Sequence, residues 1–286
     1  MSVAEFASLI ALLTSLVALS IDAMLPALPQ IAADLAVSDP NDAQLVIGLF
    51  LLGNAFGQLL FGPLSDTFGR KPVIVAGLSL FLIGCFVSVI AESFSVLLLG
   101  RVLQGVGASG PRTVCMSMVR DLYSGRSMAR IMSISMSIFI LVPTLAPALG
   151  QAIMLLVGWR YIFGTFIVFG VLGLFWLLLR QPETLADEHR RPMQFATLVS
   201  GFVTVYRSRA ALGYSLAIGT MFGAFIGFLS SVQQIFQDVF AVGRGFPYLF
   251  AILALFLGAA SLLNSRIVMH FGMKKIVQLA MACSPV

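Results

Sequence analysis

Charged residues are scarce in this sequence. Aspartate, glutamate, lysine and arginine together make up 10% of its 286 residues, whereas a soluble domain carries roughly 25%. Hydrophobic residues make up 59% of the chain, so a water-soluble protein of this composition could not cover its surface with polar side chains. The composition therefore predicts an integral membrane protein rather than a soluble domain.

Cysteine and histidine are also rare, and their positions suggest no metal or cofactor site. Cys85, Cys115 and Cys283 fall in apolar stretches and show no CxxC or other metal-binding spacing. His189 and His270 lie in polar loops. Because no nucleophile–base pair or metal cluster is found in any apolar run, we expect a protein that is not an enzyme and that needs no cofactor.

Basic residues are missing from the beginning of the chain, since none precedes Arg70. A cleaved signal peptide would begin with basic residues and carry a short apolar core. Here the apolar run extends over residues 6–28, which predicts a first helix that is not cleaved.

Long apolar runs recur along the chain. A bilayer core of about 30 Å needs roughly 20 apolar residues for each helical span. A ninth run begins near Ile276, and the sequence reaches Val286 before it could cross again. Before it, the sequence predicts membrane-spanning helices over residues 6–28, 43–63, 73–91, 95–117, 131–156, 161–179, 211–236 and 246–264.

The positive charges indicate how these helices are oriented. When the loops are assigned alternately to two sides, only Arg160 and Arg244 fall on one side, and Arg101 lies inside a helix. The positive-inside rule places the other side, with the amino terminus, in the cytoplasm. The net charge of +5 is thus a topology signal, and we expect no binding to nucleic acid. The basic residues on the cytoplasmic side are Arg70, Lys71, Arg112, Arg120, Arg126, Arg130, Arg180, Arg190, Arg191, Arg207, Arg209, Arg266, Lys274 and Lys275.

The longest polar stretch, residues 181–210, divides the chain. We expect an all-α membrane protein with a six-helix bundle over residues 1–180, a cytoplasmic linker over 181–210, and a partial carboxyl-terminal bundle over 211–286 that holds helices 7, 8 and the start of 9. A weak internal repeat supports the division: "FGPLSDTFGRK" aligns with "NSRIVMHFGMKK", and each follows the second helix of its half. Parallel repeats of this kind build one large transporter fold.

The segment "GPLSDTFGRKP" joins the second and third predicted helices across very few residues. Gly62 and Gly69 allow a tight reversal, and Asp66, Arg70 and Lys71 supply charge at the helix ends. A basic cytoplasmic turn would explain the charges alone. The longer pattern G-x-L-x-D-x-x-G-R-K, however, resembles the loop 2–3 signature of the major facilitator superfamily.

The segment "RVLQGVGASG" contains G-x-G-x-x-G as Gly105, Gly107 and Gly110. A dinucleotide site is excluded, because that motif needs a preceding strand and these glycines lie within a membrane helix. Close packing of helices through small residues explains them better. It does not explain Arg101, whose charge is costly inside a membrane. Arg101 and Gln104, with the glycine that follows, resemble the R-x-x-Q-G motif on helix 4 of the same superfamily.

The segment "LVPTLAPALGQ" places Pro143 and Pro147 four residues apart, followed by Gly150. A simple kink is one interpretation, because proline removes a backbone donor. The segment also resembles the antiporter motif on helix 5 of proton-coupled exporters. The match is imperfect, since Ala146 and Gln151 stand where that motif has glycine.

Asp22 is the only acidic residue well inside a predicted span. One interpretation is a helix-end aspartate that reaches the outer surface, since Pro26 and Pro29 follow soon after. The other is a carboxyl group in a partly desolvated cavity, which could bind and release a proton as the cavity changes sides. We favour a proton-coupling site, with Arg101 as the embedded counter-charge.

"LSIDAMLPALPQI" together with "GQLLFGPLSDTFGRKPV" resembles the Bcr/CflA branch of the drug:proton antiporters, which includes bicyclomycin and chloramphenicol exporters of bacterial inner membranes. This resemblance implies alternating access, with drug leaving as protons enter. It implies that Asp22 is the proton and cation site and that Arg101 assists its protonation cycle. It also implies that Asp66, Arg70 and Asp121 form a cytoplasmic charge cluster that stabilises the outward-facing state.

The family has twelve helices, so we expect helices 10 to 12 to be missing here. The partners implied are a small-molecule drug or metabolite, protons and the lipid bilayer, and the expected state is a monomer. Two alternatives stay open at this point. The chain could be a truncated, non-transporting remnant of such an exporter, or it could export a metabolite such as a nucleoside or an amino acid.

Overall fold

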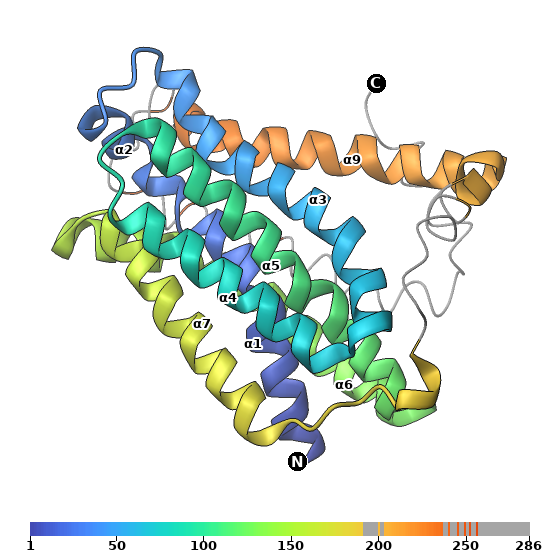
Figure 1. The fold of residues 1–286 in the computed structure, drawn as a ribbon. Coiled ribbons are helices and arrows are strands. Elements are labelled where there is room, and N and C mark those ends of the chain that lie inside the picture. Colours follow the sequence, from blue (N-terminus) through green and yellow to red (C-terminus); the bar gives the residue numbers. More distant parts are fainter. Residues whose placement is uncertain are drawn as a thin grey trace.

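The computed structural model describes residues 1–190, 200 and 203–236, with single residues at 240, 245, 249, 252 and 256. Among these residues the regular elements are all helices and no strand is present, which confirms an all-α chain to that extent. Predicted helix 8 lies outside the described residues apart from residues 249, 252 and 256, and the start of helix 9 and the repeat at 264–275 lie outside them altogether. The elements (Figure 1) are α1 (Val3–Asp22), η1 (Leu25–Ala27), α2 (Leu28–Asp34), η2 (Pro40–Gln44), α3 (Leu45–Phe68), α4 (Arg70–Val89), α5 (Phe94–Leu122), α6 (Gly125–Val157), α7 (Arg160–Arg180), η3 (Asp187–His189) and α9 (Arg209–Gln234).

Six of the predicted runs, from 43–63 to 161–179 and 211–236, each correspond to one helix. The first run, predicted as one helix over 6–28, differs because α1 ends at Asp22 and the chain continues as a 3₁₀ turn and then α2. The reason is chemical: Pro26 and Pro29 have no N–H to donate to the carbonyl groups four residues earlier. The first span is therefore a broken helix whose break directly follows Asp22.

The turns between helices are short and use glycine where the backbone requires it. A single residue, Gly69, separates Phe68 at the end of α3 from Arg70 at the start of α4, and its φ is +100°. Gly158 between α6 and α7 has a φ of +98°. Residues other than glycine rarely adopt a backbone conformation with positive φ. Glycine at these two positions therefore allows the chain to reverse direction between the helices.

Helix α5 lies between α3 and α4 and contacts both through small residues. A Cβ atom added to Gly107 would lie 2.6 Å from the carbonyl oxygen of Gly77 on α4. A Cβ atom on Gly105 would lie 2.9 Å from the backbone nitrogen of Asn54 on α3. The predicted role of these glycines in close helix packing is confirmed.

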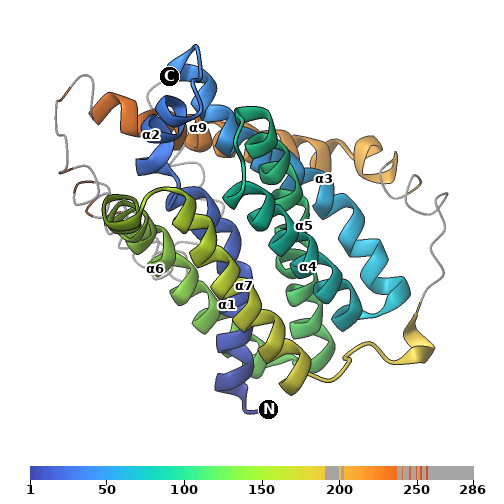
Figure 2. The ribbon, with the colours of Figure 1, turned by 60° about the vertical axis from the view of Figure 1, so that its left-hand side comes forward.

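Helix α1 forms the interior of the helix group. It contacts α5, α6 and α7, and Figure 2 shows α1 between α7 and α6 on one side and α5 on the other. Along the candidate span Val3–Asp34, 78% of the most apolar window is buried. Residues on α1 are thus surrounded by other helices rather than by lipid.

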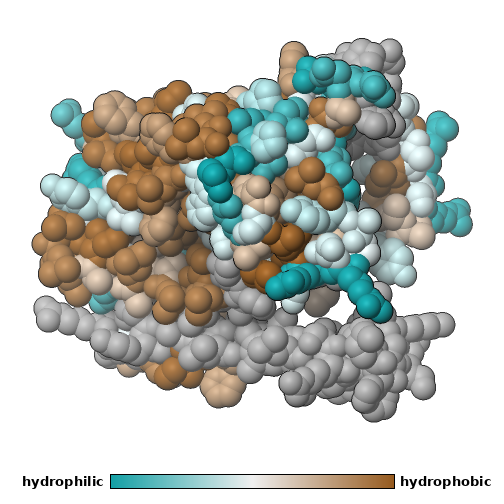
Figure 3. All heavy atoms as spheres, turned by 90° about the horizontal axis from the view of Figure 1, so that it is seen from below, coloured by the Kyte–Doolittle hydropathy of each residue, from teal (hydrophilic) through white to brown (hydrophobic). Residues whose placement is uncertain are grey.

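The outer faces of the other helices are apolar. Phe56, Phe86 and Phe175 are each more than half exposed, and Figure 3 shows hydrophobic side chains over much of the described part of one face. Four described helical segments are long and apolar enough to cross a membrane: Val3–Asp34, Asn41–Phe68, Arg70–Val89 and Arg160–Arg180. These features show a multi-pass membrane protein.

Candidate functional site

Arg101, in the middle of α5, is fully buried, with no exposed surface. Its guanidinium donates three hydrogen bonds: Nε to the carbonyl oxygen of Val46 at 2.8 Å, Nη1 to Oε1 of Gln104 at 2.7 Å, and Nη2 to the carbonyl oxygen of Ser20 at 2.9 Å. Carbonyl and amide dipoles therefore stabilise this charge. Arg101 connects α5 to both α1 and α3.

Aromatic rings complete the surroundings of this guanidinium. Its central carbon lies 4.5 Å from the ring centroid of Phe50 and 5.9 Å from that of Phe163, distances typical of cation–π contacts. Gln104, which is also fully buried, donates from Nε2 to the sulfur of Cys85 at 3.0 Å. The R-x-x-Q-G motif thus builds a polar contact between α3, α4 and α5 in the interior.

Asp22 is the last residue of α1, and its exposed fraction is 4%. The aspartate thus lies at a helix end, as the alternative interpretation had it, but it is buried and does not reach the outer surface. Within the described residues, no hydrogen bond or ion pair joins Asp22 to another side chain. Arg101 bonds instead to the backbone of Ser20, two residues earlier, so the two charged groups are neighbours but not a pair.

The predicted gate residues come together at one end of the helices. Arg70 at the start of α4 donates from Nε to Oδ2 of Asp121 on α5 at 2.9 Å, and it also pairs with Asp66 on α3. Its Nη1 bonds to Oγ of Ser65 at 2.7 Å. Of the glycines in the same motif, only Gly69 lies at the reversal. The predicted role of Gly62 in the turn is wrong, because Gly62 lies inside α3, where its carbonyl oxygen accepts a hydrogen bond from Oγ of Ser65 at 2.8 Å. One arginine therefore links three helices.

Glu183 belongs to this end of the molecule but no role for it was predicted from the sequence. Its carboxylate accepts hydrogen bonds from the backbone N–H groups of Arg70, Lys71, Thr184 and Leu185, at 2.8 to 3.0 Å. Partial burial acts to raise the pKa of this carboxyl, but the backbone donors outweigh burial and hold its pKa below the usual range. Glu183 thus caps the first turn of α4 from a segment more than a hundred residues away.

Two further contacts fix the same segment. Lys71 donates from Nζ to the carbonyl oxygen of Leu178 near the end of α7 at 2.9 Å. The hydroxyl of Thr184 lies 3.4 Å from Oδ2 of Asp121. The gate cluster, which we define as Asp66, Arg70, Lys71, Asp121 and Glu183, therefore joins α3, α4, α5 and the chain after α7.

The residues of the predicted antiporter motif lie in α6. That helix runs unbroken from Gly125 to Val157 through both prolines. The side chain of Pro143 lies outside the described residues, whereas Pro147 and Gly150 are buried. Gly150 packs directly against the backbone of Ala23, the residue after Asp22. The structure thus places this motif next to the break in the first span.

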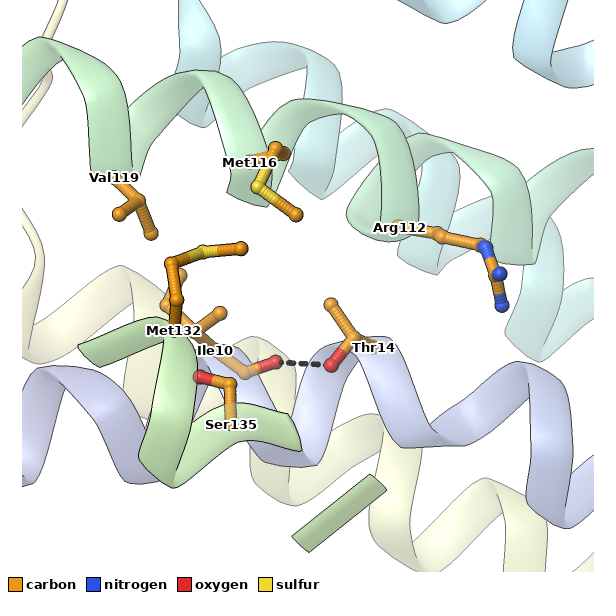
Figure 4. Close-up of a pocket in the computed structure, with 7 residues that line it drawn as sticks. All are labelled: Ile10, Thr14, Arg112, Met116, Val119, Met132 and Ser135. Atoms are coloured by element: carbon orange, nitrogen blue, oxygen red, sulfur yellow. Dashed lines mark hydrogen bonds between the residues drawn. The ribbon is translucent and has the colours of Figure 1, made fainter. Parts of the chain in front are cut away.

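A cavity of about 160 Å³ lies between α1, α5 and α6. Figure 4 shows the side chains of Met116 and Met132 within it, with Val119 at one end and Arg112 at the other. A second cavity of about 220 Å³, between α1, α6 and α7, is lined almost wholly by leucine and other apolar side chains. No group of three metal-binding side chains occurs in the part of the chain that the structure describes.

Related proteins align in sequence with most of this chain. It is 33% identical over 268 residues to an uncharacterized MFS-type transporter, YdgK, of Bacillus subtilis, and 30% identical over 272 residues to a bicyclomycin resistance protein homolog of Haemophilus influenzae. It is 35% identical over 196 residues to the multidrug resistance protein MdtL of Citrobacter koseri. These alignments cover 93%, 95% and 67% of this chain, and 66%, 68% and 49% of the respective relatives.

Solved structures share the fold. The human organic anion transporter MFSD10 aligns over 89% of this chain and 70% of its own, with a TM-score of 0.64 and 20% identity. A D-xylose-proton symporter aligns over 94% of this chain and 69% of its own, with a TM-score of 0.66 and 16% identity. The family profile of the Major Facilitator Superfamily matches residues 10–284. The chain therefore belongs to the Major Facilitator Superfamily of membrane transporters.

Proposed function

We propose that this protein exports drug-like small molecules across the bacterial inner membrane in exchange for protons, as a member of the Bcr/CflA branch. The observation that carries the proposal is Asp22, a carboxyl group that is 96% buried, has no partner side chain among the described residues and adjoins a break in the first span. Relatives named for multidrug and bicyclomycin resistance support the choice of drugs as cargo.

The chemistry of the site supports proton exchange at Asp22. An ionised carboxylate without a cation or hydrogen-bond donor is unstable in an apolar interior. Asp22 therefore releases its proton only when water or a cationic group reaches it. If water reaches Asp22 from one side of the membrane at a time, the proton is taken up on one side and released on the other. Coupled exchange requires this alternation.

The gate cluster supports alternating access. Its ion pairs and the Glu183 cap hold α3, α4 and α5 together at the end where the amino terminus lies (Figure 1). Most of the basic residues also belong to this end, and we assign it to the cytoplasm on that basis. In our proposal, residues 1–180 act as one half of a monomeric transporter, residues 181–210 as a cytoplasmic linker and residues 211–286 as part of the second half.

The cavity between α1, α5 and α6 supports apolar cargo. Its walls carry two methionines, whose side chains adapt to ligands of different shape. We expect amphipathic drugs to be better substrates than nucleosides or amino acids. A competition assay with a panel of both classes, measured as inhibition of dye efflux, tests this choice. Stronger inhibition by the polar metabolites would favour metabolite export instead.

Replacement of Asp22 tests the proposed coupling. In everted membrane vesicles from cells that produce the protein, we expect D22N to abolish the substrate-induced release of protons, measured with a pH-sensitive dye, because an amide has no titratable proton to exchange. The matched control is D42N, since Asp42 is exposed in η2. Proton release at the wild-type rate in D22N would remove Asp22 from the mechanism.

A further inference from the structure

The position of Asp22 depends on how the break in the first span is held. After α1 ends, the N–H of Ala23 bonds to the carbonyl of Leu19, and the N–H of Met24 turns to the carbonyl of Ile21 at 3.2 Å. The carbonyl of Ser20 thereby loses the donor that a continuous helix would supply. The backbone on either side of Asp22 thus depends on neighbouring helices for its conformation.

Helix α5 supplies one of these neighbours. Nη2 of Arg101 lies 2.9 Å from the released carbonyl oxygen of Ser20 and bonds to it. This hydrogen bond replaces the missing intrahelical donor and joins the last turn of α1 to α5. The turn that carries Asp22 is therefore fixed from the α5 side.

Helix α6 supplies the other neighbour, through Gly150. A Cβ atom at this position would lie 2.8 Å from the carbonyl carbon and 2.9 Å from the Cα atom of Ala23, and closer still to its carbonyl oxygen. All three atoms belong to the backbone, so no side chain can rotate away to make room. Ala23 is 1% exposed, so the contact lies in the interior of the helix group.

We propose that Gly150 is a positioning residue for Asp22. Because it has no side chain, α6 approaches the break in α1 closely enough to hold Ala23 against the turn that Arg101 fixes from the opposite side. The carboxyl group of Asp22 is thereby held in a buried place between two helices. The inference extends the proposed function, because it explains how the antiporter-like segment of α6 would influence the residue that exchanges protons.

The test measures the environment of Asp22 without transport. The purified protein is treated with a hydrophobic carbodiimide, which reacts with protonated carboxyl groups, and modification of Asp22 is followed by mass spectrometry, with D22N as the blank. We expect G150A to change the labelling rate several-fold, because the added methyl group displaces α6 from Ala23. The matched control is G164A, since nothing lies within 4 Å of a Cβ atom at Gly164 in α7, and its rate should equal that of the wild type.

An unchanged labelling rate in folded G150A would overturn the proposal. If G150A is not recovered folded, R101K provides the test from the other side of the break. Lysine keeps the charge but has one nitrogen in place of the three that bond Ser20, Val46 and Gln104. A several-fold change in the labelling of Asp22 in R101K supports a positional effect, and a wild-type rate contradicts it. Because labelling requires no proton exchange, a D22N variant that still exchanges protons would refute the proposed function and leave this result intact.

Discussion

Two buried charged residues, Arg101 and Asp22, have different surroundings in this protein. Arg101 uses carbonyl oxygens, an amide and aromatic faces, so each of its three nitrogens has a partner. Asp22 has no such partner among the described residues. The arginine therefore joins helices α1, α3 and α5 through its contacts, whereas the aspartate makes no such contact in the described part of the chain. The difference between the two follows from their contacts and not from their burial, which is nearly equal.

The sequence draws attention to Asp22 and Arg101 but does not show how the two side chains are placed relative to each other. Apolar surroundings single out Asp22 and Arg101 along the chain, and the interpretation of Arg101 as the embedded counter-charge follows from charge alone, which does not show whether the two groups meet. The structure shows that Arg101 bonds instead to one carbonyl oxygen released at the break, that of Ser20, and to Val46 and Gln104. Glu183 was missed for a similar reason: an acid that caps a helix start can be recognised locally only when it lies just before that helix, and this one lies after α7.

Removal of the Glu183 charge should loosen the gate cluster. In E183Q one acceptor oxygen becomes an amide donor that faces the backbone N–H groups of Arg70 or Lys71. We expect a loss of about 1.5–3 kcal/mol in stability, the size associated with hydrogen bonds to charged groups. Thermal unfolding in detergent measures this loss, and E188Q is the control because Glu188 is exposed. Equal melting temperatures for E183Q and the wild type would contradict the cap.

The pH dependence of this effect has a definite sign. The pKa of Glu183 is lowered in the folded protein, so its contribution to stability is complete above the ordinary glutamate value of about 4.3 and is lost as the pH falls through the lower folded value. We expect the difference in melting temperature between the wild type and E183Q to be constant near neutral pH and to shrink below about pH 4. A difference that grows with acidification would contradict the lowered pKa.

Helices α3, α4 and α5 pack closely through glycines, and the sequence predicts this role for Gly105 and Gly107. Glycines spaced along α5 lie against the backbones of both neighbours. Helix positions were also predictable, because runs of apolar residues of the required length are unambiguous. The break in the first span was not predicted, because the apolar run continues past Asp22 through Pro26 to Leu28 and its length alone is that of one span.

Adding one methyl group between α4 and α5 should be strongly destabilising. In G107A the new Cβ atom would lie 2.6 Å from the Gly77 carbonyl oxygen and 2.7 Å from the Cα atom of Phe81, so the two helices must separate. We expect a loss of about 1–3 kcal/mol, measured as a lower melting temperature in detergent. G48A is the control, since nothing lies within 4 Å of a Cβ atom at that position in α3. Equal stability of the two variants would refute the close approach.

The two ends of the whole molecule differ in chemistry. One end carries the gate cluster and the pair between Arg180 and Glu5. At the other end the indole of Trp159 donates to Oδ2 of Asp34 at 2.8 Å, and Arg160 donates to the carbonyl oxygen of Ala91 at 3.0 Å. Among the described residues, the first end is rich in basic residues and the second is not, which is the asymmetry expected of a protein with a fixed orientation in its membrane.

Thiol labelling measures that orientation. In a background without native cysteines, E92C places a thiol in the turn between α4 and α5, and S124C places one in the turn between α5 and α6. We expect an impermeant maleimide to modify E92C in intact spheroplasts, and S124C only after the membrane is opened, because the second turn adjoins the basic end. The reverse pattern would place the amino terminus outside the cytoplasm.

The way Arg101 is held has an electrical consequence. A guanidinium group stays protonated at physiological pH, and here dipoles and ring faces surround it without cancelling its charge. Together, Arg101 and Asp22 carry one positive charge when the carboxyl group is protonated and none when it is ionised. In the proposed exchange, an inside-negative voltage would therefore favour inward movement of the protonated state. It would leave the outward return of the ionised state, loaded with an uncharged drug, unaffected, so voltage as well as the pH difference would drive export.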